Sequence, residues 1–169
     1  MPARIYVGTY AKYNSGSIAG AWLDLEDYSD KADFLAACAE LHKDEADPEF
    51  MYQDYEGFPE TYYSESSVPD ELWAWLALDD DDRELLQVYL EHVNQEGAID
   101  AAREAFAGKG YRTEADWAAE WLEETGGLSG VPEHLQNYID FEAYARDARL
   151  GGDVVFVRHD GDLWVFYNR

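Results

Sequence analysis

The stretch TEADWAAEWLEET, residues 113–125, predicts an amphipathic helix. Thr113 can cap this helix, with an acidic residue three positions later in a variant of the capping box. At about 100° per residue, the acidic side chains gather within one arc of about 100°. They are Asp116, Glu120, Glu123 and Glu124. The opposite side carries Ala118, Trp121, Leu122 and Thr125. A face built from like-charge pairs costs an isolated helix roughly 0.2–0.5 kcal/mol per pair, so stability alone does not favour it.

The rest of the last third predicts helices followed by a hairpin. Gly126 and Gly127 supply a helix stop, and Pro132 opens a further helical stretch that ends before residues 150–152. Two apolar segments, residues 154–158 and 163–167, flank Asp160-Gly161, which is a strong signal for a β-hairpin.

The first third predicts a small sheet with one helix. Residues 4–10, 20–25 and 50–55 are rich in β-branched and aromatic residues and read as strands. Residues 31–42 predict a helix whose apolar face carries Phe34, Leu35, Cys38 and Leu41.

The middle predicts only helices: one from Pro69 to about residue 78, one starting at residues 79–82, and one over residues 97–107 that ends at Gly108 and Gly110. We therefore expect an α+β fold of three small domains. They are an N-terminal domain of antiparallel sheet plus helix (1–60), a central helical bundle (61–109), and a C-terminal α/β domain with a terminal hairpin (110–169).

Negative charge is concentrated in two windows. The 39 residues between Lys43 and Arg83 hold 14 acidic and no basic residues, and residues 113–145 hold 8 acidic and none basic. These windows carry −22 of the formal net charge of −25. Such a field attracts basic surfaces, above all those that hold nucleic acid. Two copies of the chain would carry 50 net negative charges, equal to the phosphates of about 25 base pairs.

Composition restricts the class of protein. Hydrophobic content of 47% and aromatic content of 15% indicate packed cores rather than a disordered acidic tail. The single cysteine, Cys38, excludes an intrachain disulfide and fits a reducing cytosol. The sequence shows no signal-peptide pattern and no apolar run of about 18 residues. We expect a cytoplasmic protein that binds neither DNA nor a membrane directly.

The sequence contains no clear catalytic or metal-binding pattern. The four histidines share no metal-ligand spacing, so we interpret them as surface or partly buried residues, and Cys38 as a core thiol. The aspartates at 79–82 lack the alternating ligands and central glycine of a calcium loop. Because 37 acidic residues make chance pairs unavoidable, no acid–base assignment is possible. We expect no enzyme activity, no metal and no cofactor.

The helix predicted over residues 113–125 carries a resemblance to a known family. The run WLEETGGL, residues 121–128, resembles the antirestriction motif of the ArdA antirestriction proteins, and residues 131–140 and 144–147 continue the match. Residues 5–10, 12–14 and 20–22 resemble the family's opening strands and turn. Residues 56–110 match only in acidity and helical pattern. The motif residues are Trp121, Leu122, Glu123, Glu124, Thr125, Gly126, Gly127 and Leu128.

The resemblance implies a DNA mimic encoded on mobile elements, without enzyme activity or cofactor, which inhibits type I restriction–modification enzymes by occupying their DNA-binding groove. It also implies three small domains in an elongated, curved dimer, and we expect a homodimer held by the C-terminal domain. The expected DNA-mimic carboxylates are Asp44, Glu45, Asp47, Glu49, Asp54, Glu56, Glu60, Glu65, Asp70, Glu71, Asp79, Asp80, Asp81, Asp82, Glu84, Glu114, Asp116, Glu120, Glu123 and Glu124.

Three alternatives remain open. A halophile-type protein is acidic for hydration, but its charge should cover the whole surface. An acidic partner of another basic DNA-binding protein, such as a histone or a nuclease, would share the same charge pattern. A metal-dependent enzyme that uses carboxylates would instead bring two or three of them together in a cleft.

Overall fold

The computed structural model describes residues 1–168. Contacts divide the chain into two compact units, the first from residue 1 to 87 and the second from Val88 onward. Each unit contains helices and one three-stranded antiparallel sheet, which confirms the predicted α+β class. The boundary lies within α4 (Asp80–His92). The division into three domains stays a prediction. No helix among the described residues is long and apolar enough to cross a bilayer.

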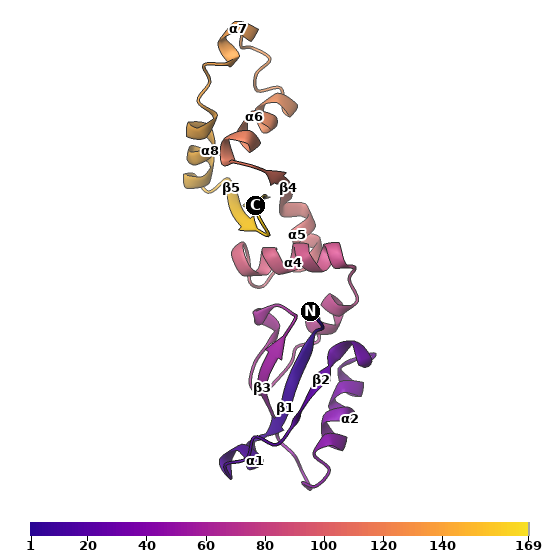
Figure 1. Ribbon diagram of the computed structural model, residues 1–169. Coiled ribbons are helices and arrows are strands. Elements are labelled where there is room, and N and C mark those ends of the chain that lie inside the picture. Colours follow the sequence, from indigo (N-terminus) through magenta and orange to yellow (C-terminus); the bar gives the residue numbers. More distant parts are fainter. Residues whose placement is uncertain (169) are drawn as a thin grey trace. The chain divides into compact units, whose positions relative to one another are not determined.

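The sheet of the first unit has β1 (Arg4–Thr9) at its centre, between β2 (Ala21–Asp24) and β3 (Phe50–Glu56). These are the three predicted strands. The predicted helix is α2 (Lys31–Leu41), which lies along the sheet (Figure 1). Phe34 and Cys38 of α2 are fully buried, as are Ile5 and Val7 of β1, because alternate residues of a strand point to the same face.

Short elements complete the first unit. They are α1 (Tyr10–Asn14), the 3-10 turns η1 (Leu25–Asp27) and η2 (Glu60–Tyr62), and α3 (Glu71–Leu76). Trp73 of α3 lies 5.7 Å from the Phe34 ring, so α3 extends the same core. The helix predicted to run from Pro69 to about residue 78 is therefore present but shorter.

The sheet of the second unit is ordered β4–β6–β5, with β4 (Phe106–Tyr111), β5 (Val154–His159) and β6 (Asp162–Tyr167). The predicted hairpin is confirmed. Its turn residues Asp160 and Gly161 both have positive φ, 47° and 88°, as a type I′ turn requires.

Strand β4 differs from prediction, because we expected a helix over residues 97–107. Helix α5 (Ile99–Ala105) ends earlier, and the chain then pairs with β6. Gly108 and Gly110 adopt positive φ, 145° and 93°, within the two register shifts of this pairing. The glycines stop the helix, as expected, but also permit an irregular edge strand.

Two helices cover one face of the second sheet. Trp117 and Ala118 of α6 (Glu114–Glu124) and Ala145 of α8 (Phe141–Leu150) are buried against Val165 of β6. The long helix predicted from Pro132 is instead two helices, because α7 (Glu133–Gln136) stops before the separately capped α8. Asp140 caps α8 by accepting a hydrogen bond from the Ala143 amide at 2.9 Å.

Candidate functional site

The acidic side chains lie at the surface of both units. Among the described residues, the buried polar or charged side chains are Thr9 and His42, and no carboxylate is buried. Fifteen of the twenty expected mimic carboxylates are exposed. The five that are half-buried are Glu45, Glu56, Asp82, Glu84 and Glu114. The candidate site is therefore an extended set of surface carboxylates.

Several of these carboxylates lie at the N-termini of helices. Asp79 caps α4 by accepting a hydrogen bond from the Asp82 amide at 2.9 Å, and Asp80 and Asp81 follow in the first turn. The positive end of the helix dipole offsets part of their mutual repulsion. The aspartate run thus has a structural reason to be here, in agreement with its interpretation as a helix N-terminus.

Helix α6 presents an acidic face as the sequence predicts. The capping box is present, with Thr113 Oγ1 accepting from the Asp116 amide and Asp116 Oδ2 accepting from the Thr113 amide, both at 3.1 Å. Glu120, Glu123 and Glu124 are exposed, and no lysine or arginine among residues 1–168 pairs with them within 4 Å. Their charges therefore face solvent without internal compensation.

Residues beside this face differ in their surroundings. Glu114, at the start of α6, lies 3.4 Å from Arg149 Nε of α8. The pKa of Tyr111 is raised, first by burial and then by the negative charges of Glu120 and Glu124. The acidic face thus raises the pKa of a neighbouring tyrosine, whereas the pairing of Glu114 with Arg149 lies outside that face.

The motif resembling the antirestriction sequence forms the last turns of α6 and its stop. Trp121 and Leu122 are half-buried, and Trp121 packs 5.6 Å from the Tyr167 ring. Thr125 is exposed and donates its hydroxyl hydrogen to the Trp121 carbonyl at 2.6 Å. Gly126 has a φ of 73°, the left-handed conformation of a helix C-terminus, which a side chain would strain. The motif therefore combines an anchor, an exposed acidic pair and a glycine stop.

The most buried aromatic residue of α6 is Trp117, which was missing from the predicted apolar face. It is 3% exposed and lies 5.2 Å from the Phe156 ring. On a helical wheel it falls only about 20° from Glu124, at the border of the acidic arc. The buried face of α6 includes both Trp117 and Ala118. This face became apparent only from the structure, in which β5 packs against Trp117.

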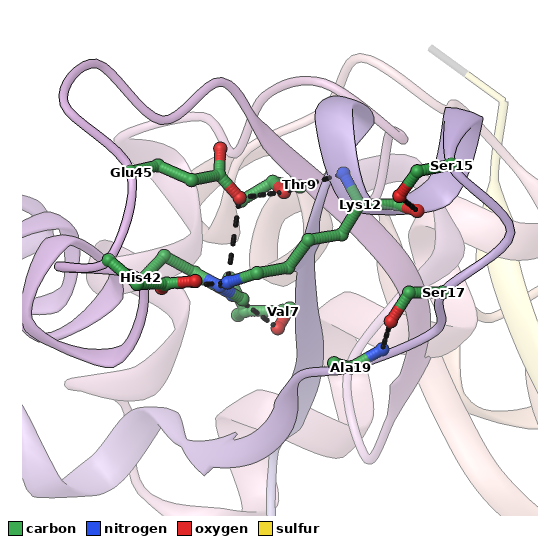
Figure 2. Close-up of polar contacts among 9 residues, drawn as sticks. Val7, Thr9, Lys12, Ser15, Ser17, Ala19, His42 and Glu45 are labelled. Atoms are coloured by element: carbon green, nitrogen blue, oxygen red, sulfur yellow. Dashed lines mark hydrogen bonds and ion pairs between the residues drawn. The ribbon is translucent and has the colours of Figure 1, made fainter.

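In the first unit, several acidic residues of the first window are paired with cations from outside it. Lys12 Nζ lies 2.9 Å from Asp44 Oδ1. It also lies 3.5 Å from Glu45 Oε1 (Figure 2). Arg4 lies 2.7 Å from Glu56, and Lys31 contacts Asp70 at 3.7 Å. The hydrogen bond to Asp44 raises the pKa of Lys12, and the same bond lowers the pKa of Asp44.

Lys12 is also part of a polar network around His42, which is 1% exposed. His42 Nε2 lies 3.0 Å from the Val7 carbonyl, so this nitrogen donates and Nδ1 accepts from Lys12 Nζ at 2.8 Å (Figure 2). Thr9 donates its hydroxyl hydrogen to Glu45 at 2.6 Å. The expectation of surface or partly buried histidines was wrong for His42. Its partners lie about 30 residues away, so no local pattern could show them.

Comparison with known protein families identifies a match. The family model of the antirestriction protein ArdA matches residues 5–161 of the 169. No curated protein matches the chain. The matched range includes the acidic face of α6, the aspartate run of α4 and the network around His42. It covers nearly the whole sequence, and the chain therefore belongs to the ArdA family of antirestriction proteins.

Proposed function

We propose that this protein presents carboxylates in place of DNA phosphates and occupies the DNA-binding groove of a type I restriction–modification enzyme, so that DNA is excluded. Membership of the ArdA family implies antirestriction through inhibition of type I enzymes. The observation that carries the mimicry is the unpaired acidic face of α6, where Glu120, Glu123 and Glu124 are all exposed.

Counterion release supplies the driving force. A DNA-binding groove holds lysines and arginines that gain free energy when a polyanion enters and its counterions are released. No acidic residue among residues 1–168 is buried, and the carboxylates that lack an internal cation, such as Glu120, Glu123 and Glu124, are available to such a groove. Because the mimic is a folded protein and carries no scissile phosphodiester bond, it would block the groove without being cleaved.

A homodimer held by the C-terminal region is part of the proposal. Helix α7 buries none of its residues, and apolar side chains in it, next to it and at the end of α8 are exposed. Leu135 is 45% exposed, Tyr138 84% and Leu150 71%. Covering these side chains would remove apolar surface from water. We place this dimer in the cytoplasm, where incoming DNA meets the restriction enzyme.

Competition binding tests the proposal. A type I enzyme bound to fluorescent duplex DNA is titrated with the protein, at salt concentrations from about 50 to 200 mM. We expect displacement of the DNA, with an inhibition constant that weakens steeply as salt rises. Inhibition that leaves DNA binding intact, or that does not change with salt, would contradict the mimicry. An unrelated globular protein of similar net charge serves as the control for non-specific polyanion effects.

A further inference from the structure

The face of the first sheet that α2 leaves uncovered combines aromatic rings with carboxylates. Arg4 and Tyr6 point to this face, since they alternate along β1 with the buried Ile5 and Val7. Trp22 and Asp54 lie directly across from Tyr6 on the two neighbouring strands. Asp24 and Glu56 lie across from Arg4 in the same way.

The contacts of Arg4 show that rings and carboxylates on this face can bind a guanidinium group. Its guanidinium carbon lies 4.7 Å from the centre of the Trp22 ring, within the range of a cation–π contact. Its Nε and Nη2 both lie 2.7 Å from Glu56 Oε2. At this position the uncovered face binds a guanidinium group with a ring on one side and a carboxylate at its edge.

Further along β1 lies a recess of about 330 Å³. It is also lined by aromatic rings and a carboxylate, but no cationic side chain of residues 1–168 lines it. We call it the tyrosine recess. Its lining includes Tyr6, Tyr13, Met51, Gln53, Tyr63 and Glu65. Neither lysine nor arginine contributes to this lining.

The groups of the tyrosine recess are available to a partner. Tyr13 is 52% exposed, and Glu65 is exposed and forms no ion pair with any residue of 1–168. Lys12, the neighbour of Tyr13 in sequence, is engaged by Asp44 and His42 instead. Glu65 also acts on Tyr10, whose pKa is raised first by burial and then by the charge of Glu65 and a side-chain hydrogen bond to it. A carboxylate can accept several hydrogen bonds, so this contact leaves room for a guanidinium group.

We propose that the tyrosine recess binds an arginine side chain of a basic protein partner, with the Tyr13 ring against the guanidinium plane and Glu65 as its counter-charge. The inference rests on the proposed function, under which that partner is the restriction enzyme. Arginine fits better than lysine because its planar, weakly hydrated head stacks on rings and pairs with carboxylates at its edge. The recess thus adds a shape-specific contact to the diffuse attraction of the carboxylates.

The test is an NMR titration of the full-length ¹⁵N-labelled protein with N-acetyl-L-arginine methylamide. We expect saturable shifts centred on the amides of Tyr13, Gln53 and Glu65. The lysine counterpart should bind more weakly, and the citrulline counterpart, which is a neutral isostere of arginine, should produce no saturable shift. Equal binding of the citrulline compound, or no saturable shift with the arginine compound, would overturn the proposal.

Matched variants locate the contact. Glu65→Gln and Tyr13→Leu should each weaken arginine binding about two- to fivefold, whereas Tyr13→Phe should retain it. Glu104→Gln alters an exposed carboxylate of the second unit, outside the recess, and should leave arginine binding unchanged. Unchanged binding in both Glu65→Gln and Tyr13→Leu would refute the assignment, and far-UV circular dichroism confirms that each variant is folded.

The two proposals fail in different ways. Wild-type protein that displaces DNA from the enzyme but does not bind the arginine compound overturns the tyrosine recess and leaves the proposed function intact. Protein that binds the arginine compound but does not displace DNA supports the recess and overturns the proposed function.

Discussion

The two acid-rich windows both contain many acidic and no basic residues, but the fold compensates their charge in different ways. In the first window, Asp44, Glu45 and Glu56 are paired with Lys12 or Arg4, both of which come from β1 or α1. In the second window, the acidic face of α6 has no such partner among the described residues. The number of charges along the chain does not distinguish the two windows. The contacts in the structure show which carboxylates have an internal cation and which do not.

This difference suggests two uses for acidic residues in one protein. Carboxylates held by internal cations connect distant segments, as Lys12 connects α1 to residues 42–45. Carboxylates without internal cations can instead attract the lysines and arginines of a binding partner. We therefore expect substitutions in the two groups to differ in their effects on stability and on binding.

The largest effect should come from removing the support beneath the acidic face. Trp117→Ala should cost the second unit about 3–5 kcal/mol, because a fully buried ring is replaced by a cavity. Trp121→Ala should cost less, since Trp121 is only half-buried. Thermal melting followed by near-UV circular dichroism measures both, with Phe34→Ala as the equivalent core change in the first unit. If Trp117→Ala melted like the wild type, the core described around α6 would be incorrect.

The next largest effect should come from removing three carboxylate charges, either from the unpaired group or from the paired group. Glu120, Glu123 and Glu124 changed together to Gln should weaken binding to a type I enzyme by roughly 0.6–3 kcal/mol, about 3- to 150-fold, with no loss of thermal stability. The matched triple change of Asp44, Glu45 and Glu56 to Gln should lower the melting temperature and weaken binding less. Equal loss of binding in both triples would remove the distinction between paired and unpaired carboxylates.

A smaller effect should depend on pH. The pKa of Lys12 is raised above 10.5, so its contribution is complete below the unfolded value and is lost as pH rises through the folded one. The pKa of Asp44 is lowered below 3.8, so its contribution is lost as pH falls through that lower value. The stability difference between wild type and Lys12→Met should therefore be flat near neutral pH and shrink at both extremes. Melting curves across pH check this, with Lys31→Met as the control, because the contact of Lys31 with Asp70 is longer, at 3.7 Å.

The smallest effect should come from a single carboxylate in the aspartate run. Asp81→Asn removes one exposed, screened charge and should weaken binding by at most about fivefold, or roughly 1 kcal/mol. Changing Asp79, Asp80, Asp81 and Asp82 together should have a clearly larger effect. Loss of all inhibition from Asp81→Asn alone would point to a localised site rather than a distributed one. Inhibition constants measured side by side at one salt concentration decide between them.

Local sequence signals predicted much of the fold. The Asp160-Gly161 turn and the Thr113–Asp116 capping box were both identified correctly, because each depends on residues within a few positions of one another. The exposed acidic face of α6 followed from helical periodicity alone.

The features that escaped prediction depend on distant partners. Phe106 begins a strand only because β6 offers it a hydrogen-bonding edge. Trp117 is buried because β5 places Phe156 beside it. His42 is enclosed by Lys12 and Val7 through contacts across about 30 residues. In the same way, the pairing of carboxylates with cations cannot be read from charge counts.

The buried thiol of Cys38 offers a practical route into these questions. Burial raises its pKa to about 12, so at pH 7 only about one molecule in 10⁵ carries the reactive thiolate. A cysteine introduced at an exposed position such as Asp81 would therefore react with a maleimide dye while Cys38 stays unmodified. The natural sequence thus already serves as a background for site-specific labelling, and fluorescence can follow the protein as it enters and leaves a restriction enzyme.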